Sequence, residues 1–273
     1  MEIKSITSAQ NASYKQAVKY QNQKEARKSA VFTAEGLRSV DEVLSSGWDI
    51  DSLWLEDGFC DQNPGYIRSL EGSAFPIYRV NRVLFKRLGD TENPQGILAI
   101  VHRKKWDVKE LLQKKDPLFV VLEDLQDPGN VGTILRTADA AGAAAVFVSK
   151  GTSDLYNPKV VRSSMGSLLH LPVISFPTVE ELAPVLQKKG VRLIAAHLKG
   201  EKTPWEADMT GPVAILIGNE GAGLSEKAAK TADILVKIPM PGQAESLNAA
   251  IASGMMLYES IRQRFLLDSS VNT

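Results

Sequence analysis

The chain has 273 residues, 44% hydrophobic and 23% charged, which is the composition of a folded globular protein and excludes a disordered chain. Its 32 basic and 32 acidic residues cancel, and its single cysteine, Cys60, excludes an intramolecular disulfide framework and fits a reducing compartment. Because the sequence has neither an apolar run of about 18 residues nor a charged-then-apolar leader, we expect a cytoplasmic protein without a membrane span or signal peptide.

The first predicted segment, residues 1–29, is basic and helical. Its helix at 11–28 is polar with little apolar periodicity, and the first 30 residues carry six basic and two acidic side chains. A solvated surface helix and an arm that faces RNA both account for this charge, so the sequence leaves the two interpretations open.

Residues 30–102 alternate between short strands and helices. The helix at 37–47 has Leu37, Val40, Val43 and Leu44 at helical spacing and ends in a glycine, which is a normal C-terminal signal. Such an alternation over about seventy residues predicts a small α/β domain. The strands are expected at 30–36, 50–57, 76–81 and 96–102, and a second helix at 64–72.

Residues 103–116 are highly charged and lead into Pro117, so we place a linker there. A second alternation fills residues 117–265 and predicts an α/β domain with a mostly parallel sheet and helices on both faces. Residues 266–273 are expected to form a tail. The strands of the second domain are predicted at 117–124, 144–149, 172–176, 191–197, 213–220 and 233–240, and its helices at 131–141, 157–170, 178–189 and 246–265.

Three loops of unusual composition follow strands of the second domain: "EDLQDPGN" (123–130), "GNEGAGL" (218–224) and "IPMPGQAESLN" (238–248). Ligands bind beyond the carboxyl ends of strands in open α/β sheets, so these loops are the candidate site. No metal is expected, because the three histidines are far apart and only one cysteine is present. The histidines are His102, His170 and His197.

The first loop leads into a helix with a buried stripe and a polar face. The polar face carries Arg136 and Asp139, and Asn130 is placed to cap the helix. From this helix alone, a surface pair of Arg136 with Asp139, worth about 0.3 kcal/mol, is a better interpretation than a functional arginine.

The second and third loops narrow the choice of ligand. The glycines at 218, 221 and 223 match neither G-x-G-x-x-G nor a phosphate-binding P-loop, which argues against a nicotinamide-dependent dehydrogenase. Prolines in the third loop remove N–H donors and leave carbonyls free, which favours a ligand with amino groups over one with phosphates. Ser246 is a plausible cap for the last helix.

Taken together, "LEDLQDPGNVGTILRTADAAGA", "ILIGNEGAGLS" and "VKIPMPGQAESLNAAIASGMMLYE" resemble, in order and spacing, the three motifs of the SpoU/TrmH family of the SPOUT superfamily. The first domain, with "TAEGLRSVDEVL" and "QGILAIV", resembles that family's RNA-binding accessory domain. The resemblance implies an RNA ribose 2′-O-methyltransferase that uses S-adenosylmethionine. It also implies a C-terminal trefoil knot and a homodimer with active sites at the subunit interface.

The resemblance also assigns residues. The resemblance implies that Arg136 is the base that takes the proton of the 2′-hydroxyl. Because a guanidinium is almost always protonated and is an awkward free base, we expect Arg136 instead to orient the target phosphate and 2′-hydroxyl and to aid proton loss. The other implied catalytic residues are Asn130, Glu220, Ser246 and Asn248. The implied cofactor-binding residues are Ala196, His197, Gly218, Asn219, Gly221, Ile238, Met240, Ser246 and Leu247.

RNA capture is assigned to the N-terminal part, through basic side chains that would contact phosphates. Ribosomal RNA, 23S in particular, is the expected substrate. A transfer-RNA methyltransferase and a non-catalytic ribosome-assembly protein are the alternatives, the latter disfavoured because Arg136, Glu220 and Asn248 are all present. The candidate phosphate contacts are Lys15, Lys19, Lys24, Arg27, Lys28, Arg79, Arg82, Lys86 and Arg87.

Overall fold

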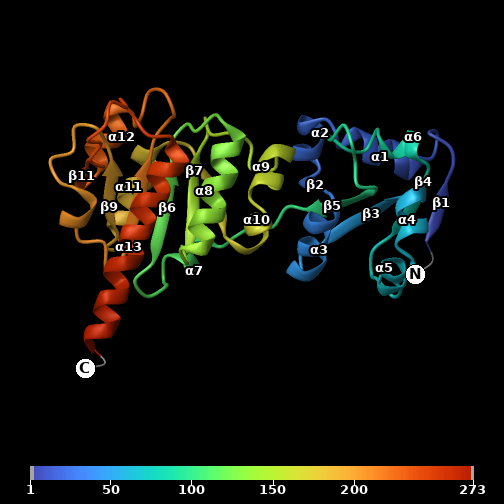
Figure 1. Cartoon of the computed structure of the whole chain (residues 1–273), viewed down its shortest axis with the longest axis horizontal. Coiled ribbons are helices and arrows are strands. Elements are labelled where there is room, and N and C mark those ends of the chain that lie inside the picture. The colour runs from blue at the N-terminus through green and yellow to red at the C-terminus, as the bar shows by residue number, and fades with distance from the viewer. Residues whose placement is uncertain (1–2, 272–273) are drawn as a thin grey trace. The chain divides into compact units, whose positions relative to one another are not determined.

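The protein is described by a computed structural model that covers residues 3–271, with side chains over residues 3–267 (Figure 1). The chain divides into two units that are each continuous in space but not in sequence. Unit 1 comprises Met1–Lys105 with Tyr156–Leu169, and unit 2 comprises Trp106–Leu155 with His170–Thr273. Residues 156–169, which were predicted to belong to the second domain, therefore pack with the first.

Unit 1 is built on a five-stranded mixed sheet in the order β1-β4-β3-β5-β2. β3 pairs in parallel with β4, and β5 runs antiparallel between β3 and β2. Trp54 of β3 is fully buried against Tyr14 and Tyr78, so the strand is apolar on the face that α1 covers. The strands are β1 (Lys4–Ile6), β2 (Val31–Glu35), β3 (Ile50–Glu56), β4 (Ile77–Val80) and β5 (Ile97–His102).

The helices of unit 1 differ from the prediction in two ways: one predicted helix is split in two, and two short helices were not predicted. The single helix expected at 11–28 is two helices, because the side chain of Asn22 accepts from the amides of Lys24 and Glu25 and starts a new one. Helices α4 and α6 were not predicted. The helices are α1 (Ala12–Lys19), α2 (Gln23–Lys28), α3 (Leu37–Ser46), α4 (Asp57–Gln62), α5 (Pro64–Ser69) and α6 (Arg82–Phe85).

The segment 156–169 completes unit 1. The one helix expected at 157–170 is two, α9 (Pro158–Ser163) and α10 (Ser167–His170), because Met165 and Gly166 take positive φ angles of 51° and 93° between them. The ring of Tyr156 lies 5.0 Å from that of Phe32, and the indole of Trp48 donates to the carbonyl of Leu169 at 2.9 Å. These contacts bury the segment against β2 and α3.

Unit 2 contains a six-stranded sheet in the order β11-β9-β10-β6-β7-β8, in which every pairing is parallel. The predicted parallel α/β architecture is confirmed. Its strands β6, β7 and β10 are buried along their whole length, as strands covered on both faces must be. The strands are β6 (Leu118–Leu122), β7 (Ala145–Ser149), β8 (Val173–Phe176), β9 (Arg192–Ala196), β10 (Val213–Ile217) and β11 (Ile234–Val236).

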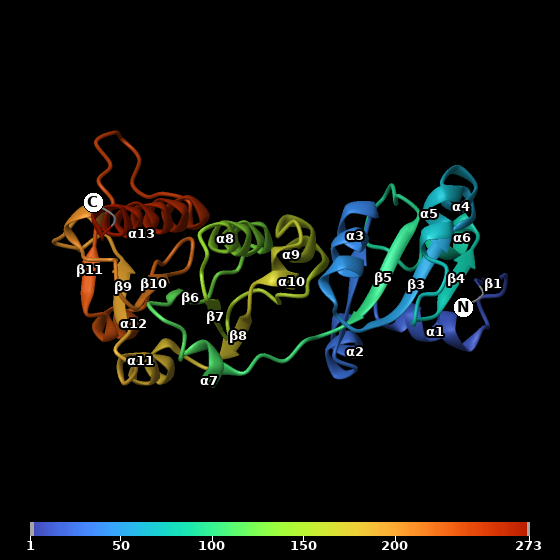
Figure 2. The same ribbon diagram turned by 90° about the horizontal axis from the view of Figure 1, so that it is seen from below.

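Helices cover both faces of this sheet (Figure 2). One face packs against α7 (Val108–Leu111), α11 (Val179–Gln187) and α12 (Glu226–Thr231), which bury Leu111, Leu186 and Ala228 in the core. The other carries α8 (Pro128–Ala140) and α13 (Ala249–Val271), with η1 (Pro204–Glu206) beside α13. Within residues 3–271, none of the helices has the length and apolarity needed to cross a bilayer.

Two predicted helix starts were wrong, and both lie at the candidate site. α8 begins at Pro128 and is capped by Asp127, whose carboxylate accepts from the amide of Asn130 at 2.8 Å. α13 begins at Ala249, and Asn248 caps it by accepting from the amide of Ala250 at 2.9 Å. The side chain of Asn130 and the hydroxyl of Ser246 are therefore not committed to capping.

Candidate active site

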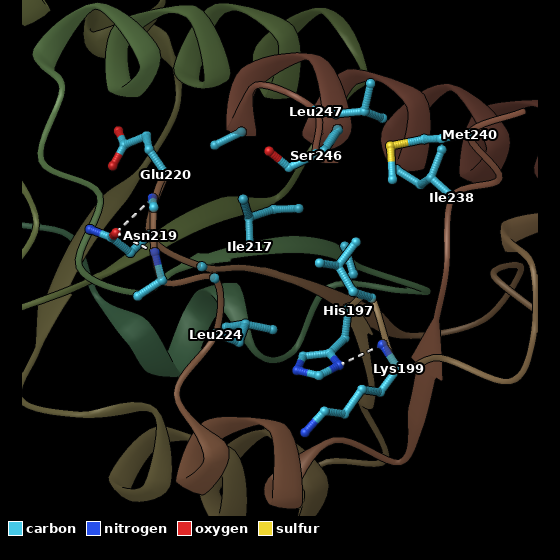
Figure 3. A pocket seen from close by; sticks show the side chains of 18 of the residues that line it. His197, Lys199, Ile217, Asn219, Glu220, Leu224, Ile238, Met240, Ser246 and Leu247 are labelled. Carbon is cyan, nitrogen blue, oxygen red and sulfur yellow. Dashed lines mark hydrogen bonds between the residues drawn. The ribbon is translucent and has the colours of Figure 1, made fainter. Parts of the chain in front are cut away.

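The carboxyl ends of β9, β10 and β11 surround a cavity of about 400 Å³ (Figure 3). The start of α13 closes it on one side. Ile217, Leu224 and Leu247 give it an apolar interior, while His197, Asn219 and Glu220 add polar groups. A cavity of this size with a few convergent polar groups is typical of a cofactor site.

The loop after β10 forms the floor of the cavity, and its path depends on Gly218. A Cβ atom there would lie 2.1 Å from the amide nitrogen of Leu224 and 2.2 Å from the carbonyl carbon of Gly223. Asn219 and Gly223 exchange backbone hydrogen bonds of 3.0 and 2.9 Å, and Gly223 adopts a φ of 71°. The chain thus folds back on itself so closely that only glycine fits at position 218.

Asn219 fixes the shape of the same loop. Its side-chain oxygen accepts from the amides of Gly221 and Ala222 at 2.9 and 3.0 Å, and its side-chain nitrogen donates to the carbonyl of Asp124 at 2.8 Å. The loop after β10 is therefore attached to the loop after β6 by a direct hydrogen bond. Asp124 itself accepts from the hydroxyl of Ser149 at 2.6 Å.

A chain of hydrogen-bonded side chains runs along one edge of the site. The side-chain amide of Asn130 donates to Glu220 Oε1 at 3.1 Å, and Asn248 donates to Asn130 Oδ1 at 2.9 Å. The backbone amides of Gln126 and Asp127 also donate to the Glu220 carboxylate, at 3.2 and 3.0 Å. One residue from each of the three predicted loops meets here.

The charge state of Glu220 follows from these contacts. Burial of the carboxyl tends to raise its pKa, but the hydrogen bonds from the side chain of Asn130 and from the two backbone amides outweigh it. The pKa of Glu220 is held below its ordinary value of 4.5, so the group is an anion at neutral pH. It can accept hydrogen bonds but is a weak proton acceptor.

The structure places all nine of the residues expected to bind the cofactor on the wall of this cavity: Ala196, His197, Gly218, Asn219, Gly221, Ile238, Met240, Ser246 and Leu247. Glu220 and Ser246, expected to be catalytic, also line it. Asn130 and Asn248 do not line it and reach it only through Glu220.

Arg136 is placed apart from the cavity of its own chain. It lies exposed on α8, and its guanidinium forms no hydrogen bond or ion pair with any side chain of residues 3–267. The surface pair with Asp139 is therefore not formed. The carboxylate of Asp139 lies instead 3.8 Å from Nδ1 of His170.

Several residues near the site were not anticipated. Leu198 and Lys199, directly after β9, and Glu226, in the first turn of α12, line the cavity. The amide of Lys199 donates to Nδ1 of His197 at 3.1 Å, which orients the ring. For Leu198 and Lys199, the position directly after β9 was the signal that could have found them. Over the described residues, no group of three or more His, Cys, Asp or Glu side chains could hold a metal ion.

The basic candidates for RNA contact all lie on unit 1. All but Arg79 are exposed: Lys15, Lys19, Lys24, Arg27, Lys28, Arg82, Lys86 and Arg87. Arg79 is half-buried and donates to Asp57 at 2.7 Å and to Asp61 at 2.9 Å. Its charge is therefore neutralised within the protein, and it is a poor candidate for a phosphate contact.

Comparison with known proteins identifies the family. Residues 117–258 match the model of the SpoU rRNA Methylase family, and residues 11–99 match the MRM3-like substrate binding domain. The chain belongs to the SpoU rRNA methylase family. The resemblance found in the three motifs is thereby confirmed, together with the α/β fold class and the enzyme class of S-adenosylmethionine-dependent RNA methyltransferases. The trefoil knot stays a prediction.

Individual relatives are similar over nearly the whole chain. The sequence is 32% identical to the 23S rRNA (guanosine(2553)-2′-O)-methyltransferase RlmP of Bacillus subtilis, over 94% of this chain and 98% of that protein. The structure matches that of the AdoMet-bound rRNA methyltransferase from Sinorhizobium meliloti with a TM-score of 0.84 and 32% identity, covering 95% and 98% of the two chains. The SpoU methyltransferase AviRb from Streptomyces viridochromogenes, in complex with AdoMet, matches with a TM-score of 0.84 and 32% identity, covering 94% and 99%.

Proposed function

We propose that this SpoU family member methylates a ribose 2′-hydroxyl of 23S ribosomal RNA in the cytoplasm. The observation that supports this most directly is the cavity at the ends of β9, β10 and β11, one edge of which carries the Glu220–Asn130–Asn248 hydrogen-bond chain. S-adenosylmethionine fits the cavity, because apolar side chains flank a space that also exposes backbone and side-chain polar groups. When bound there, it supplies an electrophilic methyl group on a sulfonium.

The chain's own residues have to position the ribose and help its proton to leave. A 2′-hydroxyl is a poor nucleophile until its proton is departing, so electrostatic help at that oxygen is required. Glu220 is an anion that holds Asn130 in place, and Asn130 is held from the other side by Asn248. Asn130 is thus a pre-positioned amide next to the cavity, available to orient the ribose.

Arg136 completes this proposal only through a second copy of the chain. Its guanidinium is exposed on α8 and has no partner among residues 3–267, which leaves it available to a ligand or another subunit. Beside α8, Ile251, Met255 and Tyr258 expose 53%, 45% and 70% of their surface on α13. They recur at i, i+4 and i+7 and form one apolar stripe. A homodimer through this stripe covers it and brings Arg136 to an interface.

The RNA target is inferred from the relatives. RlmP is named a 23S rRNA guanosine 2′-O-methyltransferase, and the relative from Streptomyces viridochromogenes a 23S rRNA uridine 2′-O-methyltransferase. A transfer-RNA substrate is the second candidate. A purely structural role in ribosome assembly is disfavoured by the intact cavity and by the retention of Arg136, Glu220 and Asn248.

Two measurements test the proposal. Calorimetry is expected to detect binding of S-adenosylmethionine and of its demethylated product but not of NAD. The purified protein, incubated with transcripts that tile 23S rRNA and with labelled S-adenosylmethionine, is expected to add one 2′-O-methyl group at a single nucleotide. Labelling of transfer RNA alone would reassign the substrate, and binding of the cofactor without methylation of any RNA would contradict the proposed activity.

A further inference from the structure

A second cavity, of about 270 Å³, lies wholly within unit 1 and has no role in the proposed methyl transfer. It is lined by the end of β2, the start of α3, the loop 91–95, and Arg162, Met165 and Gly166. The "TAEGLR" stretch of the accessory domain therefore contributes Glu35, Gly36 and Arg38 to its wall. Its volume falls just below the range of about 300–1,000 Å³ that suits drug-sized ligands and fits a single small ring system.

The loop that forms one wall is held at three points. The Glu35 carboxylate accepts from the amides of Asp90 and Thr91 at 2.9 and 3.3 Å and from the Thr91 hydroxyl. Gln95 Oε1 accepts from the amide of Leu37 at 2.7 Å, and Asp90 accepts from both terminal nitrogens of Arg162 at 3.2 and 3.3 Å. These tethers to β2, α3 and α9 make the cavity pre-formed.

The opposite wall depends on an unusual backbone. Met165 and Gly166 take positive φ angles, and a Cβ on Gly166 would lie 3.0 Å from Cδ of Glu42. A non-glycine residue in the left-handed region costs free energy and is found more often at functional sites than elsewhere. At the break between α9 and α10, the backbone of Gly166 therefore lies close to the side chain of Glu42 on α3.

Within this cavity, some hydrogen-bonding groups are not used by the protein. Among residues 3–267, the side chains of Arg38 and Asn93 form no hydrogen bond or ion pair, and Gln95 uses only its carbonyl oxygen. The cavity therefore presents guanidinium and amide donors together with an amide acceptor. A ligand with both donors and acceptors on a planar edge matches this set.

The charge of the wall argues against a phosphate. Glu35 and Glu42 oppose Arg38 and Arg162, and Arg162 is already matched by Asp90. A ligand anion would lie beside carboxylates of the wall, and Arg38 is the guanidinium of the wall that no acidic side chain of residues 3–267 already pairs. A neutral ring with polar edges meets no such repulsion, and arginine planes commonly stack on unpaired bases.

We propose that this cavity binds one unpaired nucleobase of the RNA substrate, read at its edge by Asn93 and Gln95 and covered by Arg38. The proposal rests on the proposed function, since it takes RNA as the substrate. It makes unit 1 a reader of base identity at a point separate from the methylated ribose, in addition to a surface for phosphates.

The first test uses the full-length protein and ligands without phosphate. Nuclear magnetic resonance spectra recorded with each of the four ribonucleosides are expected to show shifts of the side-chain amides of Asn93 and Gln95 for at least one nucleoside. Inorganic phosphate is expected to leave them unchanged. Shifts with phosphate alone, or no shift with any nucleoside, would overturn the proposal.

The second test uses RNA. Asn93→Ala and Arg38→Ala are each expected to raise the Kd for the unmodified 23S transcript that the enzyme methylates by about tenfold, because each removes a side chain that reads or stacks on a base. The Kd for S-adenosylmethionine is expected to stay unchanged. Arg68→Ala removes an exposed arginine of unit 1 that does not line the cavity, and is the matched control. If both cavity variants bind the transcript as tightly as the wild type, and the wild type methylates that transcript, the base-binding proposal fails while the proposed function stands. If the wild type methylates no RNA, the proposed function fails.

Discussion

Asn130 donates a hydrogen bond of 3.1 Å to Glu220 across ninety residues of sequence. The bond joins the first residues of α8 to the loop after β10, and a second bond of 2.9 Å from Asn248 to Asn130 adds the loop before α13. Three loops that are separate in the sequence are thus held as one polar edge beside the cavity. Substitutions at this edge, in the cavity and on the exposed surfaces next to them are expected to have distinct, measurable effects.

Arg136→Ala is expected to lower kcat by about 10²–10⁴-fold, the usual contribution of a group that assists proton transfer, with the Kd for S-adenosylmethionine unchanged. Arg136→Lys is expected to retain only a small part of the activity, because an ammonium lacks the planar fork of donors. Single-turnover methylation and calorimetry measure the two effects. Lys230→Ala removes another exposed cation of unit 2 and is expected to behave like the wild type. Near wild-type methylation by Arg136→Ala would contradict the assigned role.

Glu220→Gln is expected to lower the free energy of unfolding by about 1–2 kcal/mol at neutral pH, because the carboxylate accepts several hydrogen bonds. The pKa of Glu220 in the folded protein lies below its ordinary value of 4.5. The stabilisation is therefore complete above pH 4.5 and is lost as the pH falls through the folded pKa. Urea unfolding at several pH values is the measurement. The wild-type advantage should shrink on acidification, whereas exposed Glu181→Gln should change little at any pH. An advantage that grows on acidification would reverse the assigned pKa direction.

Gly218→Ala is expected to abolish S-adenosylmethionine binding, because its Cβ would overlap the backbone of Gly223 and Leu224. The floor of the cavity would have to move, and calorimetry measures the consequence. Gly65→Ala places the same methyl group where no other atom lies within 4 Å and serves as the control. Unchanged affinity in Gly218→Ala would mean that the floor does not shape the cofactor site.

Tyr258→Glu is expected to shift the protein from dimer to monomer, because it puts a charge into the apolar stripe of α13. Light scattering on a size-exclusion column measures the mass, and the methylation rate should fall along with the dimer fraction. Val83→Glu alters a side chain that is 74% exposed on unit 1 and should leave the mass unchanged. A wild-type protein that is monomeric and fully active would contradict the proposal that Arg136 acts through a second copy of the chain.

Replacing Arg82, Lys86 and Arg87 together by alanine is expected to weaken RNA binding and to lower the slope of log Kd against log salt by about 2, which is roughly 0.7 for each phosphate that the protein no longer neutralises. Filter binding over a salt series gives the slope. Arg79→Ala should leave it nearly unchanged, because Asp57 and Asp61 already neutralise that guanidinium. An equal change of the salt slope in the triple variant and in Arg79→Ala would contradict the inference that the exposed basic side chains are the ones that contact phosphates.

The fold was largely predictable because buried parallel strands leave a simple signal. Runs such as residues 118–122 and 213–217 are apolar throughout, and each was expected within a few residues of its bounds. Short elements without periodicity were missed, including β1, α4, α6 and α12. Helix breaks at Asn22 and Met165 were also missed, since a cap or a left-handed residue inside a polar stretch leaves the periodicity unchanged.

The candidate site was predictable to a different degree. The strand-end loops indicated which residues would line a cavity, and Gly218 through Gly223 owe their place to local turn chemistry that composition reveals. The hydrogen bonds that link Glu220 to Asn130, and Asn130 to Asn248, were not predictable from local sequence, because the bonded residues lie 90 and 118 residues apart and meet only in the folded sheet. The capping roles were misassigned for the same reason, since Asp127 and Asn248 were equally good caps by residue type.

The position of residues 156–169 within unit 1 has a consequence for how the enzyme can be taken apart. The polypeptide passes between the two units three times, so neither unit can be released by a single cut. A fragment that begins after Lys105 would keep α9 and α10 but strip Phe32 and Trp48 from Tyr156 and Leu169, exposing an apolar surface to water. A division of the chain into its two units would therefore have to keep residues 156–169 with residues 1–105.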